Sequence, residues 1–134
     1  MSLKLDRKAN KRRAERFGRW GEALAVYWLL LKGYQIRERR FRCAVGEIDL
    51  IATRGKTIVF IEVKYRRTGA TSEDVSPFQA DRIVRSASLY LAQNTPKRLD
   101  WETRFDLILL GPWRWPSHLK AAFGDDGWGN RSIT

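Results

Sequence analysis

Residues 46–65 read GEIDLIATRGKTIVFIEVKY, and this stretch decides the fold. Both of its halves are rich in Ile and other apolar residues, which predicts one strand over Gly46–Thr53 and another over Thr57–Tyr65. Gly55 and Lys56 stand between them and fit a two-residue hairpin turn of type II′, in which glycine comes first. We therefore expect an antiparallel hairpin whose register is set by this turn.

The register gathers charged side chains at the end of the hairpin far from the turn. Counting outward from the turn, Asp49 lies opposite Glu62. By the same count, Glu47 lies opposite Lys64 on the same face. Nearer the turn this face carries Ile51, Ile58 and Phe60. The other face is predicted to be wholly apolar, with Ile48, Leu50, Ala52, Val59, Ile61 and Val63.

Two carboxylates held this close on a half-buried face repel each other and lose hydration, so they need compensation. Magnesium is suited to this role because it prefers hard oxygen ligands, often one or two carboxylates completed by water and phosphate. The pattern predicts a Mg²⁺ site at Asp49 and Glu62. Lys64 would orient or deprotonate the attacking water, or stabilise charge that develops at phosphorus. The alternative is a solvated Glu62–Lys64 ion pair, with Asp49 capping a backbone group.

A helix is predicted before the hairpin, from Phe17 to a stop at Gly33. Its apolar residues cover more than one side, so we expect the second half to be buried by neighbours on several sides. These residues are Phe17, Trp20, Leu24, Ala25, Val26, Tyr27, Trp28, Leu29 and Leu31. Glu22 lies on a mostly apolar side, and a buried Glu seldom goes unpaired. Its two predicted roles are a further metal contact, direct or through water, and a structural ion pair with an Arg.

Four further elements complete the predicted fold. The segment Tyr34–Cys43 carries apolar residues among arginines, which is typical of an edge strand. The Ser-Pro pair at 76–77 predicts a helix start, and an apolar stripe continues this second helix to about Asn94. Phe105–Leu110 is a strand that the intervening helix would place parallel to the second strand of the hairpin. A last edge strand is expected within Leu119–Phe123.

The chain has 134 residues, with 26 Lys and Arg against 15 Asp and Glu, which gives a net charge of +11. Residues 1–20 hold eight basic and two acidic residues, and residues 36–67 hold nine and four, so the excess lies in these two segments. Such clusters favour nucleic acid over anionic lipid, because cations that neutralise phosphates release condensed counterions. The predicted contacts are Arg12, Arg13, Arg16, Arg19, Arg39, Arg40, Arg42, Arg66, Arg67, Arg82 and Arg85.

Several classes of protein and of site are excluded. Cys43 is the single cysteine, so no intramolecular disulfide forms and a reducing cytoplasm is expected. The longest apolar run, Ala23–Leu31, falls short of the roughly 20 residues that span a bilayer, so no membrane segment is expected. His118 has no nucleophile motif to serve and is predicted at the surface. Trp113 and Trp115 are interpreted as core residues, with stacking on bases as the alternative.

Four motifs, in this order, resemble those of the YraN-like family: GRWGEALA at 18–25, GEIDLIA at 46–52, FIEVKYR at 60–66 and RFDLILL at 104–110. That family belongs to the restriction-endonuclease-like superfamily, close to archaeal Holliday-junction resolvases. The resemblance covers Phe17 to Phe123. It implies an α/β fold, a mixed sheet of four or five strands flanked by helices, in the order helix-strand-strand-strand-helix-strand. It also implies a nuclease site of the PD-(D/E)xK type.

The resemblance assigns roles to individual residues. It makes Asp49 and Glu62 ligands of Mg²⁺, for which Mn²⁺ could substitute, and we add the carbonyl of Val63 to them. It makes Lys64 the catalytic lysine and Glu22 the acidic residue of the first helix.

The predicted function is a magnesium-dependent endonuclease that hydrolyses phosphodiester bonds in DNA, in preference to RNA, with branched or structured DNA as an expected substrate. The alternatives are a nucleic-acid-binding protein that retains the fold without turnover, and an interaction protein whose basic arm binds an acidic partner. Resolvase-like relatives suggest a homodimer by analogy. We expect a basic N-terminal arm over residues 1–16, a nuclease-like domain over 17–123 and a flexible tail over 124–134.

Overall fold

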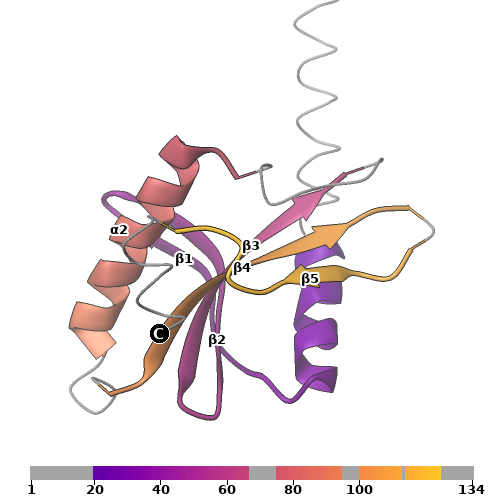
Figure 1. The fold of residues 1–134 in the computed structure, drawn as a ribbon, viewed down its shortest axis with the longest axis horizontal. Helices are drawn as coiled ribbons and strands as arrows, with labels where there is room; N and C mark the ends of the chain where they lie inside the picture. The colour runs from indigo at the N-terminus through magenta and orange to yellow at the C-terminus, as the bar shows by residue number, and fades with distance from the viewer. Residues whose placement is uncertain (1–19, 67–74, 95–99, 113, 125–134) are drawn as a thin grey trace, which may run out of the picture.

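The computed structural model describes residues 20–66, 75–94, 100–112 and 114–124, which form a sheet with a helix on each side (Figure 1). The strands lie in the order β1-β2-β3-β4-β5 and are β1 (Gln35–Cys43), β2 (Gly46–Arg54), β3 (Thr57–Tyr65), β4 (Glu102–Leu110) and β5 (Ser117–Leu119). The β3–β4 pair is parallel, and the other three pairs are antiparallel. This is the α/β arrangement of restriction-endonuclease-like folds, with the predicted element order.

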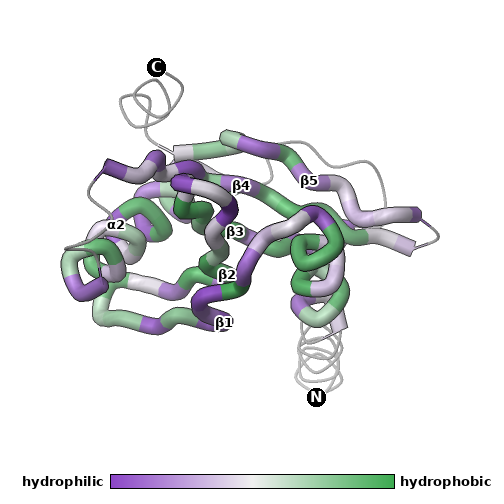
Figure 2. The backbone as a smooth tube through the Cα atoms, turned by 90° about the horizontal axis from the view of Figure 1, so that it is seen from below, coloured by the Kyte–Doolittle hydropathy of each residue, from purple (hydrophilic) through white to green (hydrophobic). Residues whose placement is uncertain are grey.

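The two helices enclose the sheet from opposite faces, as Figure 1 and Figure 2 show from two directions. α2 (Pro77–Asn94) packs Ile83 against a core that includes Phe60 of β3. A helix over residues 20–31 packs Ala25 against a second core that includes Leu50 of β2. Each face of the central strands is therefore covered, which is why these strands are apolar on both sides.

The turn chemistry of the hairpin is as predicted. Gly55 has a φ of 61° and Lys56 is not among the residues with positive φ, which fits type II′ and excludes type I′. The ladder runs from Arg54–Thr57 to Leu50–Ile61 in the predicted register. Glycine at the first turn position thus sets the pairing of both central strands.

The start of α2 also follows the prediction. The Ser76 hydroxyl accepts a hydrogen bond from the Gln79 amide at 3.1 Å, the contact of an N-cap. The helix then begins at Pro77 and ends at Asn94, the residues expected from the sequence.

The predicted burial of the first helix on several sides is wrong. Trp20 is 78% exposed and Leu31 is 82% exposed, and Leu24 and Tyr27 between them are also exposed. Figure 2 shows hydrophobic residues on the turns of this helix facing away from the sheet. The buried residues of this helix are Glu22, Ala25 and Leu29, and its small residues let it approach the sheet closely. A Cβ at Gly21 would lie 2.8 Å from a methyl group of Leu110.

The last strand is shifted from its predicted position. β5 ends at Leu119, and residues 120 and 121 form a turn in which Ala121 has a φ of 51°. A left-handed residue cannot continue a strand, so the predicted edge strand starts and ends earlier. Ala122 still donates a backbone hydrogen bond to Phe105 of β4 at 2.9 Å.

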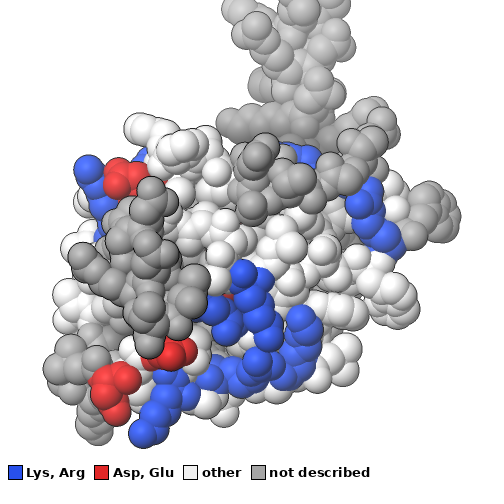
Figure 3. Space-filling view, in the orientation of Figure 1, with Lys and Arg blue, Asp and Glu red and all other residues white. Residues whose placement is uncertain are grey.

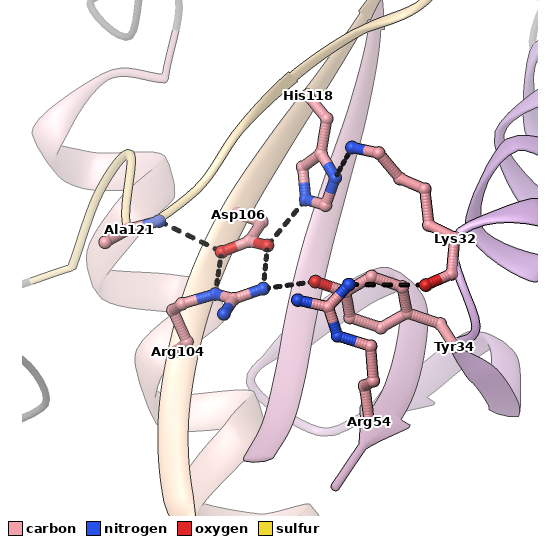
Figure 4. A network of polar contacts seen from close by, with 7 residues as sticks. All are labelled: Lys32, Tyr34, Arg54, Arg104, Asp106, His118 and Ala121. Carbon is pink, nitrogen blue, oxygen red and sulfur yellow. Dashed lines mark hydrogen bonds and ion pairs between the residues drawn. The ribbon is translucent and has the colours of Figure 1, made fainter.

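His118 is buried, in contrast to the predicted surface position. Its side chain is 1% exposed, and its Nε2 lies 2.6 Å from Oδ2 of Asp106 (Figure 4). Asp106 is fully buried in β4 and also accepts hydrogen bonds from Arg104 and from the Ala121 amide. A carboxylate within an apolar strand must be satisfied by donors, and this requirement draws the histidine inward.

The predicted arm over residues 1–16 lies outside the described residues, as does all of the predicted tail except Gly124. The same is true of Arg12, Arg13, Arg16, Arg19 and Arg67. In the part of the chain that is described, no helix has the length and apolar character needed to cross a membrane.

Candidate active site

The strand pairing changes at Asp49, where the predicted register stops. The β2–β3 ladder ends at Leu50, and Oδ2 of Asp49 accepts a hydrogen bond from the Val63 amide at 2.8 Å. Arg40 falls opposite Asp49 on β1 and has a φ of 54°, so the neighbouring strand is also irregular here. Strand irregularities re-aim side chains, and this one directs the carboxylate of Asp49 across to β3.

This irregularity corrects one predicted face. Ile48 was expected to share a face with Leu50, but it packs in the α2-side core, whereas Leu50 packs in the core of the first helix. The alternation is interrupted between the two residues. Glu47 lies 3.7 Å from Arg42 of β1, and the described β2–β3 ladder does not pair it with Lys64.

Asp49 and Glu62 line the same cleft, and their carboxyl groups lie close enough to act on each other electrostatically. Burial, together with the charge of Asp49, raises the pKa of Glu62 to about 8. Burial and the charge of Glu22 also raise the pKa of Asp49, although its bond from the Val63 amide opposes this. Two carboxyl groups that cannot both ionise easily form a site whose charge a bound cation would compensate.

Two further groups contact Glu62. The ammonium of Lys64 lies 3.9 Å from Oε1, and both side chains are largely buried. The amide of Gln79 donates to the same oxygen at 2.9 Å. Because the N-cap at Ser76 fixes the first turn of α2, it also fixes where Gln79 reaches the sheet.

Asp49, Glu62 and Gln79 line a cleft of about 460 Å³ between the sheet and the start of α2. Its walls are formed by Glu47, Asp49, Glu62, Phe78, Gln79, Arg82 and Ile83. The acidic pair lies on one wall and Arg82 on the other. The cleft therefore offers room for a phosphate group beside the carboxylates, with a cation facing it.

In this structure Glu22 has the second of its two predicted roles, a structural ion pair with an arginine. The Nε of Arg40 lies 3.0 Å from one carboxylate oxygen of Glu22 and 2.8 Å from the other. Glu22 nevertheless lies near enough for its charge to act on Asp49. It shapes the electrostatics of the site from the first helix.

The donor set is consistent with Mg²⁺. Asp49 and Glu62 supply hard oxygen ligands whose mutual repulsion a divalent cation would relieve. Within residues 20–66, 75–94, 100–112 and 114–124, no three Asp, Glu, His or Cys side chains form a complete metal cage. Water, phosphate and main-chain oxygens would have to complete the coordination, as is usual for this ion.

The arginines predicted to contact nucleic acid lie in different environments. Arg82 lines the cleft and hydrogen-bonds the Val45 carbonyl at 3.2 Å. Arg40 forms an ion pair with Glu22. Of the remaining described arginines, Arg39 is exposed and Arg66 donates a hydrogen bond to the Tyr65 carbonyl. Arg42 pairs with Glu47, and Arg85 pairs with Asp81.

Sequence reasoning missed two contacts of the site. Gln79 has no sequence signal for this role. A Gln three residues after an N-cap is expected to reach back to the cap, whereas its amide donates to Glu62. Arg40 was counted among the phosphate contacts, and its φ of 54° gave no sequence signal because arginine is not typical of that conformation.

The stability of the metal-free protein should fall as the pH rises from about 4.5 to about 8. Glu62 binds its proton more tightly in the folded chain, where its pKa is about 8 in place of 4.5. The stabilisation linked to that proton is complete below the unfolded pKa and is lost as the pH passes the folded pKa. Thermal melts in EDTA at pH 6 and pH 9 measure the loss.

In the same melts, Glu62→Gln should show a flatter pH dependence, and Mg²⁺ should stabilise the wild type more at pH 9 than at pH 5, because protons compete with the metal. A wild-type pH profile that matches Glu62→Gln would contradict the assignment.

Comparison with known proteins identifies the family. Residues 21–110 match the model of the family described as "Uncharacterised protein family UPF0102". A UPF0102 protein of Maricaulis maris is 47% identical over 84% of this chain and 89% of its own length. Others from Bartonella tribocorum and Paramagnetospirillum magneticum are 45% and 41% identical, over 78% and 84% of this chain and 81% and 91% of theirs. The chain therefore belongs to the UPF0102 family, the YraN-like family that its motifs predicted.

Proposed function

We propose that this protein is a magnesium-dependent endonuclease that hydrolyses phosphodiester bonds in DNA. The observation that carries the proposal is the largely buried carboxyl pair of Asp49 and Glu62, which lines the cleft, with Lys64 beside Glu62. The net charge of +11 supports a polyanionic substrate. Branched or otherwise structured DNA is the substrate class that the motifs favour.

Each residue has a role in this proposal. Asp49 and Glu62 would hold Mg²⁺, with the Val63 carbonyl. When bound, the metal would polarise the phosphate and activate the attacking water. Lys64 places a positive charge next to Glu62, where it stabilises the negative charge that develops during hydrolysis. Gln79 holds the orientation of Glu62.

A second candidate is a nucleic-acid-binding protein without turnover. It is favoured by the hydrogen bond from the Val63 amide to Asp49, because a capping carboxylate already has a structural role. The Glu22–Arg40 ion pair points the same way. Both candidates predict binding that weakens steeply with salt, so binding alone does not separate them.

Lys64→Met should reduce cleavage by about a hundredfold or more while DNA binding stays within a fewfold of wild type. Its ammonium is needed near the reacting phosphate, whereas phosphate affinity rests on many cations. The test is a cleavage panel of linear duplex, single-stranded and four-way-junction DNA, each incubated with Mg²⁺, Mn²⁺ or EDTA.

Lys56→Met is the matched control, because Lys56 is 78% exposed at the hairpin turn and far from the cleft. Prepared in parallel, it should cleave like wild type, so that a loss of cleavage in Lys64→Met alone excludes a contaminating nuclease. Failure of the wild type to cleave any substrate at high enzyme concentration, with no Mg²⁺ or Mn²⁺ binding by calorimetry, would favour the binding protein.

A further inference from the structure

A second group of cations gathers far from the cleft, around the end of the first helix, the hairpin turn and the turn after β5. It consists of Lys32, Arg54 and Lys120, whose charges act on one another. Figure 3 shows Lys and Arg concentrated on the lower central part of this face, with little acidic surface among them. None of the three belongs to the set predicted from the sequence to contact nucleic acid.

Two of these cations, Lys32 and Arg54, are held in place by contacts of their side chains. Lys32 precedes Gly33, whose φ of 90° ends the helix, and its Nζ lies 3.0 Å from Nδ1 of His118 (Figure 4). The guanidinium of Arg54 lies over the ring of Tyr34 at 4.5 Å and donates to the Lys32 carbonyl at 3.3 Å. Such fixed cations lose little freedom when an anion binds.

Lys120 belongs to the turn after β5, which is also anchored. The next residue, Ala121, donates its amide to Oδ1 of Asp106 at 3.0 Å. Both oxygens of Asp106 are already occupied by Arg104 and His118, so this carboxylate is not free to pair with the surface cations. Among the described residues, Lys32, Arg54 and Lys120 form no ion pair with an acidic side chain.

The cations of this group repel one another. Burial lowers the pKa of Lys32 first, and the positive charges of Lys120 and Arg54 lower it further. A bound anion would relieve this repulsion. The contacts that hold Lys32 against His118 and Arg54 over Tyr34 indicate where such an anion would lie.

An aromatic platform adjoins the cations. Trp115 is 80% exposed, so the predicted core position is wrong for this residue, and its ring stacks on that of Trp28 at 5.8 Å. Trp28 in turn lies 5.9 Å from the ammonium of Lys32. The buried indole nitrogen of Trp28 has no hydrogen-bond partner within the described part of the chain, so ring packing holds the pair together. The outer face of Trp115 is open to a flat ligand.

We propose that Lys32, Arg54, Lys120 and Trp115 form a binding surface for single-stranded nucleic acid, with phosphates on the three cations and a base stacked on Trp115. This inference rests on the proposed function in taking nucleic acid as the substrate, and it adds a single-stranded segment to that substrate. Cations that follow a backbone beside an exposed aromatic ring are the usual means of binding single strands.

A single strand fits this surface better than a duplex or a membrane does. A base can lie flat on an indole only when it is unstacked, which duplex bases are not. Lys32 contacts His118, which pairs with the buried Asp106, and Arg54 lies over Tyr34, so two of the cations have defined positions, whereas recognition of an anionic membrane needs only diffuse charge.

The test is fluorescence anisotropy of a labelled oligothymidylate and of a blunt duplex, titrated with the full chain in EDTA over a range of salt. Trp115→Ala should weaken oligothymidylate binding about tenfold with little change for the duplex, because one stacked base is lost. Replacing Lys32, Arg54 and Lys120 together with Gln should lower the slope of log K against log salt by about two, since each phosphate contact contributes about 0.7.

Two matched controls are available in the same molecule. Trp20→Ala removes an equally exposed tryptophan from the other end of the first helix, and Lys56→Gln removes an exposed lysine. Both should bind oligothymidylate like wild type. If the triple variant does not fold by circular dichroism, Lys120→Gln alone should lower the slope by about 0.7, because Lys120 makes no hydrogen bond among those of the described residues.

The proposal is overturned if Trp115→Ala and the charge variants bind oligothymidylate as the controls do, or if the wild type does not bind it at low salt. It is also overturned if vesicles of phosphatidylserine and phosphatidylcholine bind in a Trp115-dependent manner and oligothymidylate does not. Intact, Trp115-dependent binding together with no cleavage in the Mg²⁺ panel would support this surface and count against the nuclease alone.

Discussion

Asp49→Asn is expected to raise the melting temperature of the metal-free protein by several degrees and to reduce Mg²⁺-dependent cleavage by about a thousandfold or more. Asparagine keeps an oxygen to accept from the Val63 amide, and it removes the charge that raises the pKa of Glu62. Relief worth about 1 kcal/mol would shift the melting temperature by about 4 °C. The loss of cleavage follows because a metal ligand is worth several kcal/mol of transition-state stabilisation.

Calorimetric melts in EDTA and in Mg²⁺, together with cleavage rates, measure both effects on one preparation. The metal should stabilise the wild type and leave Asp49→Asn nearly unchanged. Asp100→Asn is the matched control, because that carboxylate is exposed and lies 3.9 Å from Lys56, away from the cleft. A variant that melts below the wild type in EDTA and still cleaves would show that Asp49 is only a structural cap.

The hairpin was predictable because two independent signals agreed. Glycine at position 55 selects the turn, and period-two alternation then sets every pair as far as Leu50 and Ile61. The prediction stopped being valid at Asp49, where a side chain replaces the ladder and Ile48 changes face. The period-two alternation of the sequence does not indicate this interruption. The interruption is produced jointly by β1 and β3.

The first helix shows a different limit. Its apolar stripe had the spacing of a buried face, but small residues are what let a helix approach a sheet closely. Gly21 and Ala25 therefore face the sheet while Trp20 and Tyr27 remain exposed. Hydrophobicity alone therefore predicts burial for the face of this helix that is exposed. The burial of His118 was not predictable for a related reason. It depends on the contact with Asp106, which lies twelve residues away on another strand.

The two buried acidic centres of this protein differ in how completely they are satisfied. Asp106 accepts four hydrogen bonds from Arg104, His118 and Ala121, and these lower its pKa even though burial opposes them. The pKa of Glu62, in contrast, is raised to about 8. The carboxylate of Asp106 is thus fully neutralised by its donors, whereas the centre that contains Glu62 lacks positive charge. Such a local departure from good packing rules is typical of a functional site.

Asp106→Ala is accordingly expected to destabilise the fold by about 3–5 kcal/mol, because it leaves Arg104 and His118 buried without their acceptor. This is a large share of the about 5–15 kcal/mol that stabilises a domain. Urea unfolding followed by circular dichroism measures the change. Asp100→Ala, at an exposed position, should unfold within about 0.5 kcal/mol of wild type. An Asp106→Ala midpoint close to that control would contradict the assigned role.

The pH dependence tests the same carboxylate in the opposite direction from Glu62. The pKa of Asp106 is lowered by folding, so its stabilisation is present above its ordinary value of 3.8 and is lost as the pH falls through the folded value. The stability difference between wild type and Asp106→Asn should therefore be largest near neutral pH and shrink below about pH 4. A difference that stays constant down to pH 2 would mean that the shape of the side chain matters here and its charge does not. A shrinking difference would show that ionised Asp106 holds β4, β5 and the end of the first helix together, and with them the surface cations that surround it.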